Sequence, residues 1–118
     1  MLKIKRVYEQ PDKNDGVRML VDRLWPRGVR KEDAKIDQWM KDIAPSDELR
    51  SWFAHRAERW NKFKKLYCQE LQTKQNLVQT LRAISKKNTV TLLYAAKDNL
   101  RNNAVVLQEY IENKQVEN

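Results

Sequence analysis

The chain has 118 residues and a mass of 14.2 kDa, the size of one domain, and it is 41% hydrophobic and 34% charged, which is typical of a folded globular protein. A single Cys and a single His exclude an internal disulfide, a multi-Cys zinc site and a His-rich metal centre, and two glycines exclude a glycine-rich phosphate loop. The net charge of +8 is concentrated between residues 50 and 101, where twelve basic residues stand against three acidic ones, and such a segment favours contact with phosphates, nucleic acid or acidic partners.

The amino-terminal residues predict a strand rather than a targeting signal. Leu2 to Tyr8 alternate apolar and polar side chains, so they lack the continuous apolar stretch of a signal peptide. No run of the sequence approaches the length of a membrane span, and we predict no membrane partner. The one cysteine, Cys68, lies in a helical pattern, which suits a small, half-buried hydrophobic residue in a reducing compartment. These features predict a cytoplasmic protein.

Two strands with a turn between them open the predicted fold. Residues 2–8 alternate with a period of two, which is typical of a strand. Residues 10–16 (QPDKNDG) combine Pro, Asp, Asn and Gly, which indicates a turn. Residues 17–24 (VRMLVDRL) predict a second strand, and Trp25-Pro26-Arg27-Gly28 ends it because proline cannot donate a hydrogen bond to a strand ladder.

The middle of the chain predicts a short strand and then a helix. Residues 31–43 fit a helix or a strand, and we expect a short helical turn followed by a strand around residues 38–42. A helix begins after Pro45, with Ser46 as its N-cap and two acidic residues in its first turn, where they suit the positive end of the helix dipole. The apolar side chains expected to face inward are Leu49, Trp52 and Phe53.

Two amphipathic helices are predicted to follow. Residues 56–72 carry apolar side chains at three- and four-residue steps, which predicts a helix with one buried face. This stripe consists of Trp60, Phe63, Tyr67 and Leu71. The next helix repeats the pattern with Leu77, Leu81 and Ile84, and it ends at Lys86-Lys87-Asn88, where cations suit the negative end of a helix.

A buried strand and a last helix complete the prediction. Residues 89–96 (TVTLLYAA) form a continuous apolar run of strand length, which indicates a central strand covered on both faces. Residues 104–111 (AVVLQEYI) predict a helix with two apolar rows. The order of these elements predicts the α/β class: a small mixed, partly parallel sheet flanked by helices, in a single compact domain over residues 1–118.

Two loops that follow predicted strands carry polar residues. In open α/β sheets, ligands bind beyond the carboxyl ends of the strands. Residues 22–28 offer guanidinium groups that suit a phosphate or carboxylate, and residues 97–103 lead into a helix N-terminus, which attracts anions. We therefore predict that the two loops approach each other and bind an anion. The predicted contacts are Arg23, Arg27, Lys97, Arg101 and Asn103, with Trp25 as a stacking surface and Asp22 or Asp98 as the base of any reaction.

Structural roles are the alternative for several of these residues. In that interpretation Asp22 and Arg23 only pair to lock the loop, Trp25 and Pro26 pack as a hydrophobic plug, and Asn102 or Asn103 caps the last helix. His55 is interpreted as a helix cap, because no nucleophile stands near it in the sequence. No metal and no cofactor are predicted, since the aspartates in turns have no spacing typical of a metal cage; they are Asp12, Asp15, Asp33 and Asp37.

The predicted function is binding of a phosphorylated small molecule or nucleotide at the two loops. Whether the protein is also an enzyme, and its oligomeric state, are left open. One alternative is weak nucleic-acid binding over the basic helices, which a steep salt dependence would identify. Another is a protein-interaction module without catalysis.

The segment Leu20 to Gly28 (LVDRLWPRG) resembles the hallmark of the YeaO-like bacterial family of unknown function. The similarity continues through residues 43–46 (IAPS), 49–53 (LRSWF) and 90–97, and it covers nearly the whole chain. It implies a compact cytoplasmic α/β domain and no particular activity. More distant members of the wider superfamily carry Cys and Glu at the end of the last strand, followed by a Cys-His-Arg cluster. The resemblance implies no such thiol chemistry here, because the corresponding residues are Tyr94, Ala96, Asn102, Asn103 and Ala104.

Overall fold

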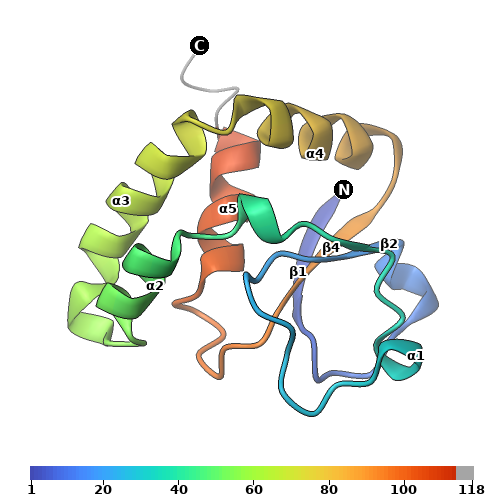
Figure 1. Ribbon diagram of the computed structural model, residues 1–118. Coiled ribbons are helices and arrows are strands. Elements are labelled where there is room, and N and C mark those ends of the chain that lie inside the picture. Colours follow the sequence, from blue (N-terminus) through green and yellow to red (C-terminus); the bar gives the residue numbers. More distant parts are fainter. Residues whose placement is uncertain (114–118) are drawn as a thin grey trace.

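The computed structural model describes residues 1–113, which form four strands, five α-helices and three 3-10 turns (Figure 1). The strands are β1 (Leu2–Arg6), β2 (Val17–Leu20), β3 (Gln38–Trp39) and β4 (Val90–Tyr94). The α-helices are α1 (Lys31–Ala34), α2 (Asp47–Phe53), α3 (Trp60–Gln72), α4 (Gln75–Lys87) and α5 (Asn103–Asn113). The 3-10 turns are η1 (Lys13–Asp15), η2 (Lys41–Ile43) and η3 (Ala57–Arg59).

The four strands form one sheet in the order β1-β4-β2-β3, and each neighbouring pair is parallel. The last strand in the sequence, β4, therefore lies between the first two. All five residues of β4 are buried, which confirms the prediction of a central strand. The predicted α/β class is also confirmed, because helices cover a small sheet and the long crossover from β2 to β4 contains α1 to α4.

Several element boundaries differ from the prediction because turns occupy residues that the pattern assigns to a strand or a helix. β2 ends at Leu20 rather than at residue 24. The Val21 N–H still donates to the Leu93 carbonyl, but beyond Val21 the chain leaves the sheet toward Pro26. β3 has two residues, and η2 follows it directly and brings Ile43 into the core. The helix expected from residue 56 begins at Trp60, after the turn η3.

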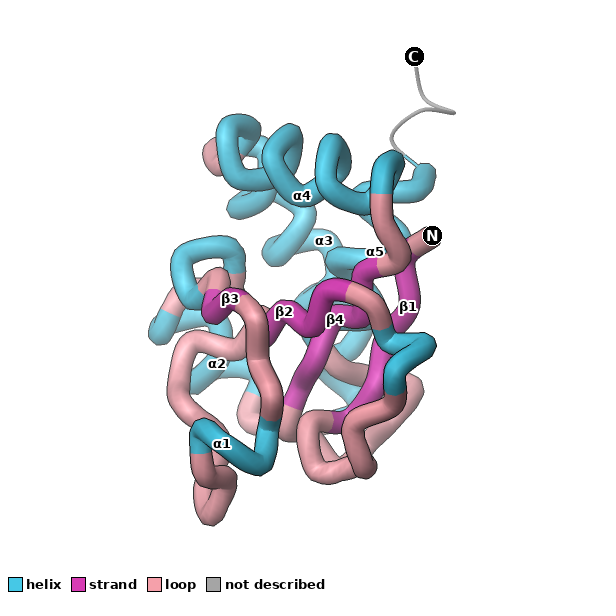
Figure 2. The backbone as a smooth tube through the Cα atoms, turned by 90° about the vertical axis from the view of Figure 1, so that its right-hand side faces the viewer, coloured by secondary structure: helices cyan, strands magenta, loops and turns pink. Residues whose placement is uncertain are grey.

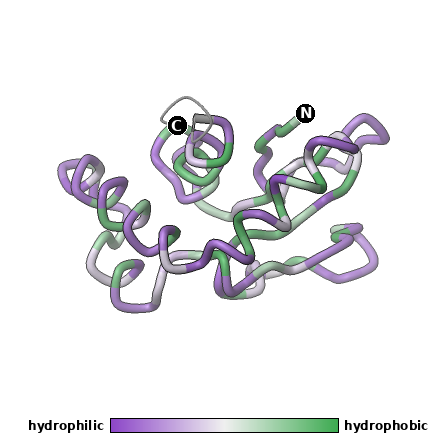
Figure 3. Tube along the Cα trace, turned by 90° about the horizontal axis from the view of Figure 1, so that it is seen from above, coloured by the Kyte–Doolittle hydropathy of each residue, from purple (hydrophilic) through white to green (hydrophobic). Residues whose placement is uncertain are grey.

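Helices pack on one face of the sheet and enclose the main core. Side chains from alternate positions of the strands point to this face, and Figure 2 shows α3, α4 and α5 gathered on one side of the strands. The predicted stripe of α3 is confirmed, since Phe63, Tyr67 and Leu71 are buried and Trp60 packs at the edge of the core. Figure 3 shows hydrophobic and hydrophilic residues alternating along the helices, as amphipathic packing requires.

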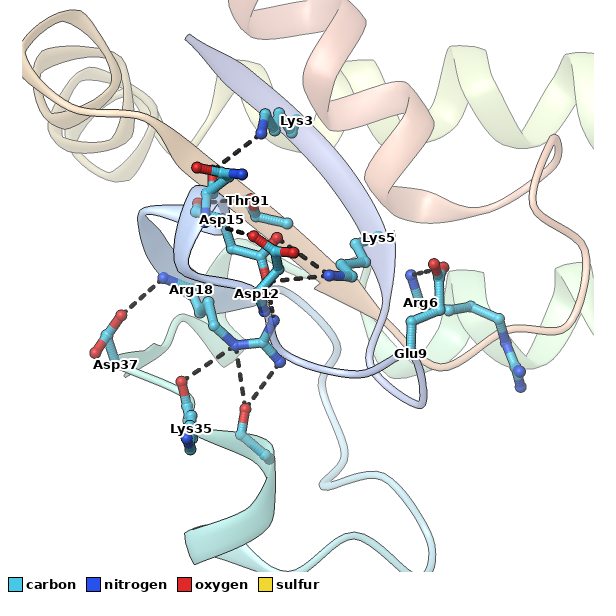
Figure 4. A network of polar contacts seen from close by, with 12 residues as sticks. Lys3, Lys5, Arg6, Glu9, Asp12, Asp15, Arg18, Lys35, Asp37 and Thr91 are labelled. Atoms are coloured by element: carbon cyan, nitrogen blue, oxygen red, sulfur yellow. Dashed lines mark hydrogen bonds and ion pairs between the residues drawn. The ribbon is translucent and has the colours of Figure 1, made fainter.

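The opposite face of the sheet is covered by loops, η1 and α1. A small apolar cluster of Val7, Leu20 and Leu93 lies there, with Trp25 and Val29 packed against it. Beside this cluster the covering is polar, and Figure 4 shows the side chains of Lys5, Asp15 and Arg18 directed toward one another. We call the group of Lys5, Asp15, Arg18 and Thr91 the second-face network.

The turn before β2 depends on a glycine. Gly16 has a φ of +66°, and a Cβ atom at this position would lie 2.1 Å from the Thr89 carbonyl oxygen. Only glycine allows this approach of the η1 segment to the start of β4. The predicted turn at residues 10–16 is confirmed, and it delivers Asp15 to the second face of the sheet.

Within residues 1–113, no helix combines the length and the apolar character that crossing a membrane requires.

Candidate functional site

The carboxyl ends of β2 and β4 lie side by side, and Asp22 joins the two loops that follow them. One Asp22 carboxylate oxygen accepts a hydrogen bond from the Ala95 N–H at 3.0 Å. The other accepts from the Asn103 side-chain amide at 3.0 Å, and this amide also donates to the Val21 carbonyl at 2.9 Å. The loops therefore meet, as predicted, because β4 is inserted next to β2.

The Asp22 carboxyl is partly buried in a positively charged surrounding. Burial raises the pKa of Asp22, while the hydrogen bonds from Asn103 and Ala95 and the positive charges of His55 and Arg50 counteract part of that rise. His55 adopts a left-handed backbone conformation in the turn after α2, and its ring lies 6.2 Å from that of Phe53. The site at Asp22 thus includes charges from the α2 region, which the sequence prediction did not assign to it.

Arg23 points away from Asp22, so the interpretation of a locking Asp22–Arg23 pair is wrong. Its guanidinium donates to the Pro45 carbonyl at 3.1 Å and to the Ala44 carbonyl at 3.3 Å. It also lies 3.9 Å from the carboxylate of Asp47, the first residue of α2. These contacts attach the loop after β2 to the segment before α2 and hold the guanidinium in one orientation.

Arg50 approaches the same carboxylate oxygen as Arg23. Its guanidinium lies 3.4 Å from Asp47 Oδ1, so two guanidinium groups from different elements meet at one exposed acid. Lys74, at the start of α4, donates to the Ala44 carbonyl that Arg23 also contacts. Burial lowers the pKa of Lys74, and the charge of Arg23 lowers it further, against the opposing effect of Glu70.

We call the group of Asp22, Arg23, Asp47, Arg50 and Asn103 the carboxyl-end cluster. Sequence reasoning missed Asp47 and Arg50 as site residues. The only signal was their three-residue spacing at the start of a predicted helix, which is equally typical of an isolated surface ion pair. Their approach to Arg23 depends on how Pro45 packs against the loop after β2.

The second predicted loop is closed on itself around Asp98. This carboxylate accepts hydrogen bonds from the backbone N–H groups of Leu100 and Arg101, which lower its pKa, and it pairs with the Arg101 guanidinium at 3.1 Å. Asn102 is buried and its side chain accepts from the Val105 N–H, so the interpretation of Asn102 as the cap of α5 is confirmed. The Asp98 carboxylate and the Arg101 guanidinium are thus paired with each other within this loop.

Arg27 and Lys97 are exposed, and within the described part of the chain neither side chain forms a hydrogen bond or ion pair. Arg27 is fixed only through its backbone carbonyl, which accepts from the Tyr8 hydroxyl. Trp25 packs edge-on against Trp39 with ring centroids 5.5 Å apart, and its indole N–H donates to the Val29 carbonyl. Together with the buried Pro26, these contacts fit the hydrophobic plug that was one interpretation of this loop.

Two open hollows lie elsewhere on the surface. One, of about 560 Å³, lies between residues 7–11 and 28–35, and the other, of about 590 Å³, lies between α2 and α3. In the second hollow the Ser46 hydroxyl donates to Glu70 at 2.7 Å and accepts from the Leu49 N–H, which confirms Ser46 as the N-cap of α2. Among the described residues, no group of three or more His, Cys, Asp or Glu could hold a metal ion.

Comparison with known proteins assigns the chain to a family. Residues 1–118 match the model of a family described as the inactive DUF488-N3 subclade. The uncharacterized protein YeaO of Escherichia coli is 42% identical over 110 residues, with 93% of this chain and 96% of YeaO covered. Uncharacterized proteins Rv3073c of Mycobacterium tuberculosis and Mb3100c of Mycobacterium bovis are each 40% identical over 113 residues, with 96% of this chain and 95% of each relative covered. No solved structure matches the chain significantly. The resemblance to the YeaO-like proteins is thus confirmed, and the chain belongs to the family of the inactive DUF488-N3 subclade.

Proposed function

We propose that the protein binds a phosphorylated small molecule or a nucleotide at the carboxyl-end cluster. The observation that carries this proposal is the meeting of two guanidinium groups, from Arg23 and Arg50, at one exposed carboxylate oxygen beside the junction of the two loops. Guanidinium groups bind phosphate oxygens with charge-assisted hydrogen bonds, so two of them close together favour a phosphate. Arg23 offers its Nη1 group for this purpose, because its Nε and Nη2 groups already donate to the Pro45 and Ala44 carbonyls.

The position of the cluster supports the proposal. It lies beyond the carboxyl end of β2, next to the N-terminus of α5, and α/β proteins commonly bind ligands beyond such strand ends. The N-terminus of an eleven-residue helix adds a favourable potential for an anion. Arg27 and Lys97, whose charges are not neutralised by a partner among the described residues, add to the positive potential around the loops.

The proposal is one of binding rather than catalysis. The subclade that matches the chain is described as inactive. The resemblance noted in the sequence also implies no thiol chemistry at Tyr94, Ala96 and Asn102 to Ala104. Asp98 is held in its own loop and Asp22 is used to join two loops, so neither is arranged as a free base. We also propose a cytoplasmic location, which the single half-buried cysteine supports.

Nucleic-acid binding is the second candidate, and the exposed lysines at the end of α4 favour it. Lys86 and Lys87 are exposed, and within residues 1–113 they form no ion pair. Other cations of the basic segment are not available to phosphates, because Arg82 is buried against the Ile111 carbonyl and Lys74 is used at Ala44. The structure therefore offers fewer free cations than the net +9 of residues 50–101 suggests.

Thermal unfolding with inorganic phosphate or AMP tests the first candidate. A ligand at 100 times its Kd stabilises the folded state by about 2.7 kcal/mol, which raises Tm by several degrees in a protein of this size. We expect such a shift for the parent and its loss in Arg50→Ala. Arg56→Ala is the matched control, because Arg56 is also exposed and, among the described residues, forms its one ion pair with Glu58. The absence of a shift in the parent, or an equal loss in both variants, contradicts the proposal.

A further inference from the structure

We infer that Asp47 is an internal stand-in for the ligand's anionic group, and that the site selects a phosphomonoester over a carboxylate. This inference rests on the proposed function, since it concerns the same two guanidinium groups. Asp47 lies near both Arg23 and Arg50, and in the free protein its single negative charge offsets part of their positive charge. A phosphate displaces the Asp47 side chain and takes over both guanidinium contacts.

The contacts of Asp47 are long for charged hydrogen bonds. Its Oδ1 lies 3.4 Å from Arg50 and 3.9 Å from Arg23, whereas a well-formed guanidinium–carboxylate bond measures about 2.7–2.9 Å. Both contacts use the same oxygen, so neither guanidinium is bound by a pair of oxygens. Asp47 is the first residue of α2, so the helix fixes its backbone.

The Asp47 side chain is also free to leave. It is 65% exposed, and such surface ion pairs are weak because water screens them and because long side chains lose freedom in forming them. The cap of α2 does not depend on it, since Ser46 provides the hydrogen bond to the Leu49 N–H. Rotation of Asp47 into solvent therefore leaves the helix in place.

Arg23, by contrast, is oriented in advance. Its Nε and one terminal nitrogen donate to the carbonyls of Pro45 and Ala44, which hold the guanidinium plane still. The other terminal nitrogen, Nη1, forms no hydrogen bond within the described residues. A guanidinium that is already ordered loses little freedom when a ligand binds, which favours affinity.

The geometry favours a phosphomonoester because of its oxygens and its charge. Three terminal oxygens can contact two separate guanidinium groups at once, while a carboxylate ligand would only repeat the arrangement of Asp47. A phosphomonoester also carries about −1.5 to −2 charges at pH 7, compared with −1 for a carboxylate. Replacement of Asp47 by phosphate is therefore favourable, and replacement by acetate gains nothing.

The inference is tested by measuring inorganic phosphate affinity, by isothermal titration calorimetry, in the parent and in Asp47→Asn. Removing the competing carboxylate is expected to tighten phosphate binding about two- to fivefold, the range that a surface ion pair of ordinary strength allows. Asp33→Asn is the matched control, because Asp33 is equally exposed, lies in the first turn of a short helix and contacts Arg30. This control is expected to leave the affinity unchanged. Acetate serves as the carboxylate probe and is expected to bind at least tenfold more weakly than phosphate to the parent.

The outcomes separate the inference from the proposed function. If the parent binds phosphate but Asp47→Asn binds it with the same affinity, or Asp33→Asn tightens it equally, the stand-in role of Asp47 is overturned while the binding function holds. If acetate binds as tightly as phosphate, the selectivity is overturned. If neither the parent nor Asp47→Asn binds phosphate, both proposals fail. Asp47→Ser, which also removes the charge at this position, repeats the test should the asparagine variant not fold.

Discussion

The second-face network and the carboxyl-end cluster both join acids to arginines, but they differ in burial and in the closure of their hydrogen bonds. In the second-face network, Asp15 and Arg18 are buried and lie 2.6 Å apart. The Arg18 guanidinium also donates to the Ala34 and Lys35 carbonyls. The Asp15 carboxylate accepts from Lys5 and from the Asp12 N–H as well (Figure 4). Among the side chains of residues 1–112, no buried nitrogen or oxygen lacks a hydrogen-bond partner.

The carboxyl-end cluster is open by comparison. Asp47 is exposed, its contacts are longer than 3.3 Å, and one Arg23 nitrogen is unused within the described residues. Burial explains the difference, because an unpaired ion away from water is very costly. A buried charged group therefore has to form all its hydrogen bonds with other groups of the protein. Exposed ions tolerate loose contacts. We therefore expect the closed network to stabilise the fold, and we propose the open cluster as the ligand site.

The largest expected effect comes from opening the closed network. Arg18→Met keeps the length of the side chain but leaves the Asp15 carboxylate buried without its main partner. We expect a loss of about 3–5 kcal/mol in the free energy of unfolding, measured by urea denaturation. The double variant Asp15→Asn with Arg18→Met should lose less than the sum of the single variants, since neither the Asp15 carboxylate nor the Arg18 guanidinium is left buried without the other and only the part-buried Lys5 loses its partner. A loss below about 1 kcal/mol for Arg18→Met would mean that the second-face network does not stabilise the fold.

Acid tests the same network through Asp15. Burial alone raises the pKa of Asp15, but hydrogen bonds from the Asp12 N–H, Lys5 and Arg18 outweigh this effect and lower the pKa below its ordinary value of 3.8. The ionised carboxyl therefore stabilises the fold fully at pH values well above 3.8 and loses this contribution as the pH falls through the lower folded-state pKa. We expect the urea midpoint to fall on acidification from about pH 5 to pH 2. In Asp15→Asn the fall should be shallower, and an identical slope would exclude Asp15 as its source.

Asp22 is intermediate, since it is half-buried and joins two loops. Asp22→Asn leaves one acceptor oxygen where the carboxylate received bonds from both Ala95 and Asn103, so one donor faces the new amide nitrogen. We expect a loss of about 1–3 kcal/mol in the free energy of unfolding. Burial raises the pKa of Asp22, so ionising this carboxyl costs the folded state stability as the pH rises through that pKa. Asp22→Asn removes this cost, which offsets part of the loss in the free energy of unfolding at pH 7. Asp33→Asn, at an exposed site, should change stability by less than about 0.5 kcal/mol, and equal losses in the two variants would contradict a joining role for Asp22.

The smallest effect on stability is expected at the open cluster. Asp47→Asn should change the free energy of unfolding by no more than about 1 kcal/mol, because its two ion pairs are exposed and long. The same denaturation measurement compares it directly with Arg18→Met. A loss above about 1 kcal/mol would show that this cluster, too, holds the fold and would remove the contrast between the two groups.

Most of the fold could be predicted from the sequence, whereas only part of the site could. The stripe from Trp60 to Leu71 indicates a buried helix face, and the apolar run of residues 89–96 indicates a buried strand. Both patterns can be recognised within one short stretch of sequence. The approach of residues 22–28 and 97–103 also followed from a general rule for strand ends. The partners of Arg23 could not be predicted, since Pro45 and Asp47 come near it only after η2 turns the chain back to the core.

The sequence by itself determined the type of most elements, the turn at Gly16, the cap at Ser46, and the side chains that face the core, and it limited the cap of α5 to Asn102 or Asn103. These features depend on neighbouring residues, whose spacing and backbone preferences are local. Only the tertiary structure decided which charged side chains form ion pairs and hydrogen bonds with one another. The insertion of β4 between β1 and β2 brings Asp15 and Arg18 under cover and sets Asp22 against Ala95 and Asn103. A charged residue forms a complete set of internal hydrogen bonds where other segments pack over it, and it keeps loose contacts where it stays exposed. Which segments pack over a residue depends on the whole folded chain.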